Sequence, residues 1–147
     1  MTAYDQINSF LVDIWSRIGK IEERALTAGL ESDVSITEIH ILEKIGDNPR
    51  CRMSEIARAL GVTLATLTVA CDKLVSKDLI SRERDARDKR VVIVSLTPKG
   101  MAAYDFHKRF HDRMIDAAIS GMDDDEQRAL GRALDKLQTF FEELAEA

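Results

Sequence analysis

Four basic side chains lie within seven residues of the sequence: Arg84, Arg87, Lys89 and Arg90. They surround a polar segment, 85–90, that separates two runs rich in β-branched residues, 79–84 and 91–96. This pattern predicts a two-stranded hairpin with a charged tip. An arginine at such a tip can enter a narrow minor groove of DNA, where the negative potential is strongest. We expect Arg87 to do so, with its guanidinium oriented by Asp85 or Asp88.

A second group of side chains suited to DNA lies just before this hairpin. The segment 63–77 is predicted to be a helix that Thr63 can cap and that packs through Leu64, Leu67, Cys71, Leu74 and Val75. Its other face presents hydroxylated and methyl-bearing side chains, short enough to approach base edges in the major groove. N–H groups at a helix start bind phosphate, and lysine pairs with it. The candidate residues on this helix are Thr63, Thr66, Thr68, Val69 and Lys73.

The segment before this helix completes a larger motif. Residues 54–60 predict a short helix with Ile56, Ala57 and Leu60 facing inward, and Gly61-Val62 interrupts it. Two helices joined by so short a turn form a helix-turn-helix. A helix-turn-helix followed at once by a charged hairpin predicts a winged helix.

The charge distribution supports a local anion-binding surface. The whole chain of 147 residues has a formal charge of −5, which excludes a molecule that is basic throughout. Residues 50–90 contain ten basic and six acidic side chains, a net charge of +4. The other 106 residues contain eleven basic and twenty acidic side chains, a net charge of −9. A basic segment in an acidic protein is typical of a localised nucleic-acid interface.

Both ends of the chain show helical periodicity. Apolar side chains recur at spacings of three and four residues at Ile7, Leu11, Ile14, Ile18 and Ile21, and again at Leu130, Leu134, Leu137, Phe141 and Leu144. Such narrow stripes predict long helices that pack against each other or against a second copy. A two-fold dimer is the usual oligomer of a small protein.

Three helix starts are marked by capping residues. Ser35 and Glu38 form a predicted capping box, and Asp123 with Glu126 forms another. Thr97-Pro98 places an N-cap before a proline at the first helical position and predicts a helix that ends near Ile119.

Other classes of function have weaker support. The sequence contains no Gly-rich phosphate loop, nucleophile elbow or paired catalytic carboxylates, so we expect no enzyme and no cofactor. His107 and His111 lie four residues apart and can share a helix face as metal ligands do. Two histidines do not make a site, and further ligands would have to come from Asp105, Asp112 or His40. We therefore expect no metal site.

Cysteine usage and the N-terminal sequence predict a cytoplasmic protein. Cys51 and Cys71 are too few for a disulfide framework, and the N-terminus lacks the pattern of a secretion signal. Cys71 falls on the packed face of its helix and is expected to be inert. Cys51 is expected in a loop, where it could be oxidised. No apolar run approaches the roughly 18 residues of a membrane span.

Three stretches of sequence resemble the MarR family of bacterial transcription regulators: SEIARALGV at 54–62, DARDKR at 85–90 and SLTPKG at 95–100. The resemblance extends over nearly the whole chain. It implies an obligate dimer in which the N- and C-terminal helices interlock and each winged helix binds half of a pseudo-palindromic operator. It also implies that 63–77 is the recognition helix and that Arg87, preceded by Asp85, is the wing-tip arginine.

Further stretches are similar to one branch of the MarR family, the repressors of fatty-acid synthesis genes: IEE at 21–23, DVSITEIH at 33–40, VTLATLT at 62–68, KRFH at 108–111 and GM at 121–122. In that branch the resemblance implies long-chain acyl-acyl carrier protein as co-repressor. The fatty acid would enter an apolar tunnel, and the acidic carrier would dock on the surface.

The sequence offers candidates for both contacts. Bulky residues at the junction of the lobes would line a ligand pocket, or would simply pack as core: Trp15, Ile36, Ile39, His40, Phe106 and Phe110. A basic cluster could receive the carrier: Lys108, Arg109 and Arg113. Because Asp105, Asp112 and Asp116 interleave with this cluster, a solvated helix face is the alternative.

Together these observations predict a mainly α protein with a small β wing, organised as one domain over 1–147. A winged helix-turn-helix lobe is expected over 35–97, between dimerisation helices at 1–30 and 100–147. The expected function is a homodimeric repressor that binds an inverted-repeat operator in double-stranded DNA, with acyl-acyl carrier protein as co-repressor. The alternatives are a regulator released from DNA by a small aromatic ligand, a metal or redox sensor of the same fold, and a protein-interaction module.

Overall fold

The computed structural model describes residues 1–30 and 33–147, which form two compact units, 1–110 and 111–147. The elements in chain order are α1 (Ala3–Ser9), η1 (Phe10–Ile14), α2 (Trp15–Gly29), α3 (Ile36–Asp47), β1 (Cys51–Arg52), α4 (Met53–Leu60), α5 (Leu64–Ser76), β2 (Ile80–Arg84), β3 (Val92–Leu96), α6 (Pro98–Ile119) and α7 (Asp124–Glu146). The first unit contains every element up to the first half of α6, and the second contains the rest of α6 and α7. The predicted mainly α fold with a small β wing is confirmed.

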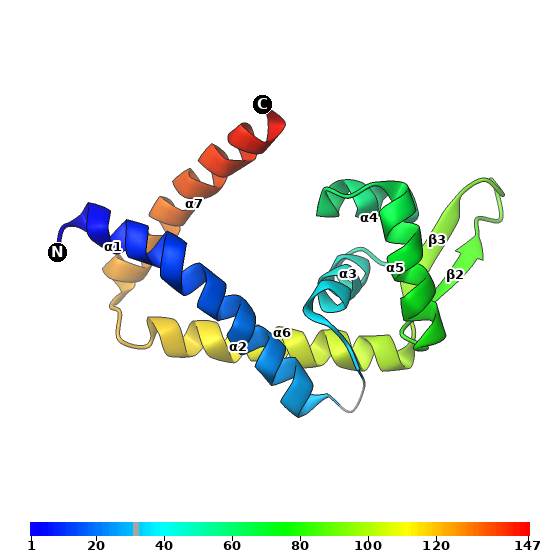
Figure 1. Cartoon of the computed structure of the whole chain (residues 1–147), viewed down its shortest axis with the longest axis horizontal. Helices are drawn as coiled ribbons and strands as arrows, with labels where there is room; N and C mark the ends of the chain where they lie inside the picture. The colour runs from blue at the N-terminus through cyan, green and yellow to red at the C-terminus, as the bar shows by residue number, and fades with distance from the viewer. Residues whose placement is uncertain (31–32) are drawn as a thin grey trace. The chain divides into compact units, whose positions relative to one another are not determined.

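The core of the first unit lies around α3. Its buried side chains come from α3, α5, the residue before β2 and strand β3, and include Ile39, Leu42, Ile45, Leu67, Leu74, Leu79 and Val94. Helix α4 packs on α5, and Figure 1 shows α5 beside the β2–β3 hairpin. Gly61 ends α4 in the left-handed region, with φ of 65°, and so permits the tight turn into α5. The predicted helix-turn-helix is therefore present.

The wing is part of a three-stranded antiparallel sheet with strand order β1-β3-β2. Strands β2 and β3 pair along their whole length, from Ile80 opposite Leu96 to Arg84 opposite Val92. Strand β1, which pairs Cys51 with Val94 and Arg52 with Ile93, was not predicted from the sequence. A two-residue strand has no periodicity of its own, and its pairing partner lies about forty residues further along the chain.

The predicted terminal helices are present, each with an exposed apolar stripe. In the N-terminal helix, Ile7, Leu11 and Ile14 are between 36% and 52% exposed. A π-helical segment, η1, interrupts this helix, and the N–H of Trp15 donates to the carbonyl of Phe10. In the second unit, α7 exposes Leu130, Leu134, Leu137, Phe141 and Leu144.

Two of the three predicted helix caps form as expected. The side chain of Asp123 accepts from the backbone of Glu126, whose carboxylate accepts in return from Asp123 N–H. Thr97 Oγ1 accepts from Gly100 N–H at 3.0 Å. At α3 the prediction was half wrong, because the Glu38 carboxylate accepts from Lys77 Nζ at 2.9 and 3.0 Å instead of closing the box with Ser35. The charged side chain of Lys77, just after α5, outcompetes a neutral backbone donor.

The start of α6 is tied to the end of α5 through three successive carbonyls. Lys99 Nζ donates to the carbonyl of Lys77, Thr97 Oγ1 to that of Asp78, and Thr97 N–H to that of Leu79. These bonds satisfy carbonyls that follow the last turn of α5. The helix that leaves the wing is thereby fixed to the helix that precedes it.

Among the residues that the structure describes, no single helix is long and apolar enough to cross a membrane. The pair α4 and α5, bent by 109°, meets that test only when the two helices are taken together.

We expect Gly100→Ala to destabilise the fold. A Cβ at this position would lie 1.9 Å from the carbonyl oxygen of Leu79, so either α6 or the start of β2 would have to move. Overpacking of this kind costs about 1–3 kcal/mol. Thermal and urea unfolding monitored by circular dichroism would measure the loss. Gly19→Ala is the matched control, because nothing lies within 4 Å of its added Cβ, and equal stability of the two variants would contradict the prediction.

Candidate nucleic-acid interface

The exposed face of α5 presents the side chains expected to contact DNA. Thr63, Thr66, Thr68, Val69 and Lys73 are all exposed. Thr63 Oγ1 caps the helix by accepting from Thr66 N–H at 3.1 Å, and Thr68 Oγ1 donates to the carbonyl of Leu64 at 2.8 Å. These bonds occupy both hydroxyl groups within the helix itself, and Val69 on the same helix is 61% exposed. An apolar, methyl-rich surface suits thymine methyl groups.

Leu64 differs from the sequence prediction. It was expected on the packed face of the helix but is 51% exposed. Val75, expected on the same face, is 37% exposed. Leu64 lines a groove between α5 and the wing, together with Arg52, Ser54, Thr68, Arg82 and Arg90. Helical periodicity places an apolar side chain on one face of a helix, but it does not tell whether that side chain is buried in the core or lines a surface groove. Arg52, Ser54 and Arg82 were not predicted as part of this surface, because the predicted contacts came only from the helix at 63–77 and the tip of the hairpin at 84–90.

The wing is held in shape by its own polar groups. Arg84 Nη1 donates to the carbonyl of Lys89 at 2.7 Å, which closes the base of the hairpin loop. Asp85 Oδ1 accepts from the backbone N–H groups of Arg87 at 2.7 Å and Asp88 at 3.3 Å, an Asx turn. These bonds lower the pKa of Asp85 below its ordinary value, the bond from Arg87 N–H contributing most. The turn is thus intact at neutral pH and is lost only as the pH falls through the lowered pKa.

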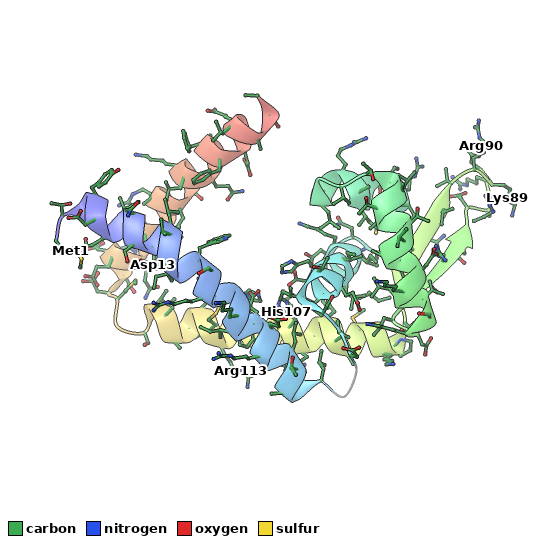
Figure 2. The ribbon with its side chains drawn as sticks, viewed as in Figure 1. Met1, Asp13, Lys89, Arg90, His107 and Arg113 are labelled. Atoms are coloured by element: carbon green, nitrogen blue, oxygen red, sulfur yellow. The ribbon has the colours of Figure 1, made fainter. Side chains whose placement is uncertain are left out.

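The expected partner of Arg87 was wrong in detail. Asp85 orients the backbone of Arg87 and Asp88 rather than a guanidinium. Asp88 binds the guanidinium of Arg90, with Nε to Oδ1 and Nη2 to Oδ2 both at 3.1 Å, and this pair lowers the pKa of Asp88. Arg87 is exposed at the tip, and Figure 2 shows Lys89 and Arg90 projecting from the same end of the hairpin. The wing therefore presents Arg87 on a turn that carboxylates organise.

An ion pair joins the wing to α5. Arg82 Nη1 on β2 lies 2.7 Å from Asp72 Oδ1 on α5, and the Arg82 side chain is 30% exposed. The two elements also pack on each other, so this pair adds a polar contact to the packing between the helix and the wing.

The residues proposed for a ligand pocket lie in different surroundings. Ile39 is fully buried in the core, Trp15 is 69% exposed, and Ile36 and Phe106 pack against the core. Phe110 stacks on His107 with ring centroids 6.3 Å apart. His40 lines a cavity of about 240 Å³ between α3, α4 and α5. The assignment of these six residues to a ligand stays a prediction.

The basic cluster on α6 is exposed at Lys108, Arg109 and Arg113. Lys108 Nζ lies 5.9 Å from the ring centre of Tyr104, a cation–π distance. The assignment of this cluster to an acidic carrier stays a prediction.

The environment of the cysteines argues against a thiol sensor. Cys51 was expected in a loop, but it lies on β1 and is buried, and burial raises its pKa. Burial likewise raises the pKa of Cys71 to about 11. Because the thiolate is the reactive form, both groups are poorly suited to oxidation.

Comparison with known proteins connects this geometry to transcription regulators. The model of a family described as the MarR family matches residues 34–92. The crystal structure of Streptococcus pneumoniae FabT in complex with DNA is 38% identical, covers 96% of this chain and 99% of that chain, and superposes with a TM-score of 0.91.

Curated relatives give the same class of protein. The transcriptional regulator BilQ of Clostridium symbiosum is 30% identical over 71% of this chain and 72% of its own length. An uncharacterised regulator of Bacillus subtilis, YhjH, is 30% identical over 65% of this chain. The matched region spans 54% of YhjH, so about half the length of that relative is represented here.

We expect Arg87→Ala to weaken DNA binding by roughly tenfold and to reduce the dependence of affinity on salt by about one counterion per half-site. The guanidinium contributes charge at the wing tip, and alanine removes it without disturbing the turn, which Asp85 forms with the backbone. Fluorescence anisotropy at several salt concentrations measures both quantities. Arg109→Ala, an exposed arginine on α6, is the control. Unchanged affinity of Arg87→Ala would show that the wing assignment is wrong.

Two substitutions at Asp85 separate its charge from its role in the turn. Asp85→Asn keeps the oxygen acceptor and removes a negative charge near DNA, so we expect equal or higher affinity. Asp85→Ala removes the acceptor for Arg87 N–H, so we expect lower affinity although the charge is also lost. The measurement is the dissociation constant for the operator at fixed salt. If both variants bound more tightly to the same extent, Asp85 would act through charge alone.

Proposed function

Because the chain belongs to the MarR family of transcription regulators, we propose that it is a homodimeric repressor of fatty-acid synthesis genes with long-chain acyl-acyl carrier protein as co-repressor. The observation that carries this proposal is the likeness to the FabT–DNA complex, which extends over both terminal helices as well as the winged helix. The stretches that resemble the fatty-acid branch lie on α2, α3, α5 and α6, so they are not confined to the DNA-binding motif.

The exposed apolar stripes support the dimer. Soluble proteins rarely leave contiguous apolar surface without a partner. Two apolar stripes are exposed to solvent in the single chain: one at Ile7, Leu11 and Ile14, and one along α7. A second copy related by a two-fold axis would cover the same stripes on both chains, because a two-fold interface is self-complementary. Two winged helices would then bind two half-sites about one turn of DNA apart.

The proposed action of the co-repressor follows from linkage. A ligand changes DNA affinity only through its difference in affinity for the conformations that bind and do not bind DNA. The three bonds between the start of α6 and the end of α5 transmit a displacement of α6 to the recognition helix. A carrier that docks at Lys108, Arg109 and Arg113 would contact the same helix.

The proposal is tested by fluorescence anisotropy on the promoter of the host's fatty-acid synthesis genes, with long-chain acyl-acyl carrier protein or the unacylated carrier. We expect the acylated carrier to tighten binding by about 5–150-fold, the usual range of coupling between two sites, and the unacylated carrier to have little effect. Specific binding that ignores both carriers would contradict the co-repressor, and absence of specific binding would contradict the role in fatty-acid synthesis.

Charge reversal separates docking from DNA binding. We expect Arg109→Glu to bind DNA alone as the wild type does and to lose most of the tightening by the acylated carrier. Lys136→Glu, on α7, is the control for a change of net charge. Equal tightening of both variants would exclude the basic cluster on α6 as the docking site.

A further inference from the structure

Three side chains that can ligate a metal meet inside the first unit, each from a different helix. They are Glu22 on α2, His40 on α3 and His107 on α6. His40 Nε2 lies 4.0 Å from Glu22 Oε2, and a ring nitrogen of His107 lies within 4.8 Å of a carboxylate oxygen of Glu22. The two imidazole rings are 6.2 Å apart between centroids, with 66° between their planes. Figure 2 labels His107 on α6.

The burial of this cluster is unusual for its chemistry. His107 is 1% exposed and Glu22 is 7% exposed, and glutamate is almost never fully buried unless it is paired. His40 is half-exposed, with 49% of its side chain accessible. Glu22 and His107 are therefore buried, whereas His40 lies at the surface. An ion could reach the two buried residues from solvent beside His40.

A fourth residue orients His107 as a metal ligand. Glu43 Oε1, on α3, lies 2.5 Å from His107 Nδ1. A carboxylate on Nδ1 favours the tautomer in which Nδ1 is protonated and Nε2 carries the lone pair. Histidines that bind metals almost always have such a partner on the other ring nitrogen, and it makes the ligand more basic.

We infer that Glu22, His40 and His107 form a binding site for a divalent transition-metal ion of the zinc class. Two imidazoles and one carboxylate are a donor set that Zn²⁺ accepts, with ligand distances of about 2.0–2.2 Å. Ligand atoms around a tetrahedral ion lie about 3.4 Å apart by that geometry. The 4.0 Å between His40 and Glu22 and the 6.2 Å between the two imidazole centroids are wider, so the half-exposed His40 side chain would rotate inward to complete the site. Harder cations such as Mg²⁺ prefer oxygen ligands and do not fit this set.

The sequence suggested only part of this site. Its signal was the four-residue spacing of His107 and His111, and it named His40 as a distant candidate. Glu22 and Glu43 were not predicted, because three helices must pack before they approach the histidines. His111 lies one turn beyond His107 on α6 and belongs to the second unit. The proposal is therefore made for the residues of the first unit.

The test uses ZnCl₂ and the full chain after removal of metal with a chelator. Equilibrium dialysis with elemental analysis measures stoichiometry, and competition with a chromophoric chelator measures affinity. We expect one Zn²⁺ per chain in the wild type. Glu22→Gln and His40→Gln are expected to lower the affinity by at least about tenfold, and Glu43→Gln by about 10–100-fold as an outer partner.

Glu23→Gln is the matched control, since it removes a neighbouring but exposed carboxylate of α2 and is expected to bind zinc as the wild type does. His40→Gln is the safest ligand variant, because this side chain is half-exposed, and circular dichroism would confirm that each variant is folded. Absence of stoichiometric zinc in the wild type, or equal affinity of Glu22→Gln, His40→Gln and the control, would overturn the site. None of these measurements involves DNA or a carrier protein, so they are independent of the proposed repressor function.

Discussion

The bonding of the start of α6 to the end of α5 is the constraint on which the rest of the first unit depends. Three successive carbonyls after α5, the expected recognition helix, accept from Thr97 and Lys99. Gly100 permits this contact, because any side chain there would meet the carbonyl of Leu79. The recognition helix, the first strand of the wing and α6 consequently share one junction. The start of α6 is therefore joined to the end of α5 by hydrogen bonds as well as through the wing.

Much of this architecture could be predicted where local chemistry decides the conformation. Thr63, Thr97 and Asp123 act as helix caps because a short side chain can reach its own backbone whatever the tertiary fold. The prediction failed where a distant group competed or contributed. Glu38 accepts a hydrogen bond from Lys77, which is 39 residues away in sequence, and Cys51 lies in a strand that pairs with Val94. Neither partner is visible in a local pattern.

The interface shows the same division. The exposed face of α5 and the basic tip of the wing follow from periodicity and composition, and the structure places those residues on the surface. The partners of the wing carboxylates do not follow, because Asp85 and Asp88 lie within reach of several donors. The two carboxylates have different partners: Asp85 accepts from the backbone of the turn, and Asp88 binds the guanidinium of Arg90. Acidic residues in a basic hairpin therefore shape the tip, at the cost of some charge.

The polar cluster around His107 extends the argument to the helices outside the winged helix. Burial of a carboxylate and an imidazole costs free energy unless each gains strong partners. Glu43 supplies one such partner to His107, and Glu22 lies beside His40 on the neighbouring helix. These contacts link α2, α3 and α6, whereas the bonds of Thr97 and Lys99 link α6 to α5. A metal ion held by the cluster would thus hold α2 against α3 and α6. Because α6 is bonded to the end of α5, the ion would also restrict movement between α2 and the expected recognition helix.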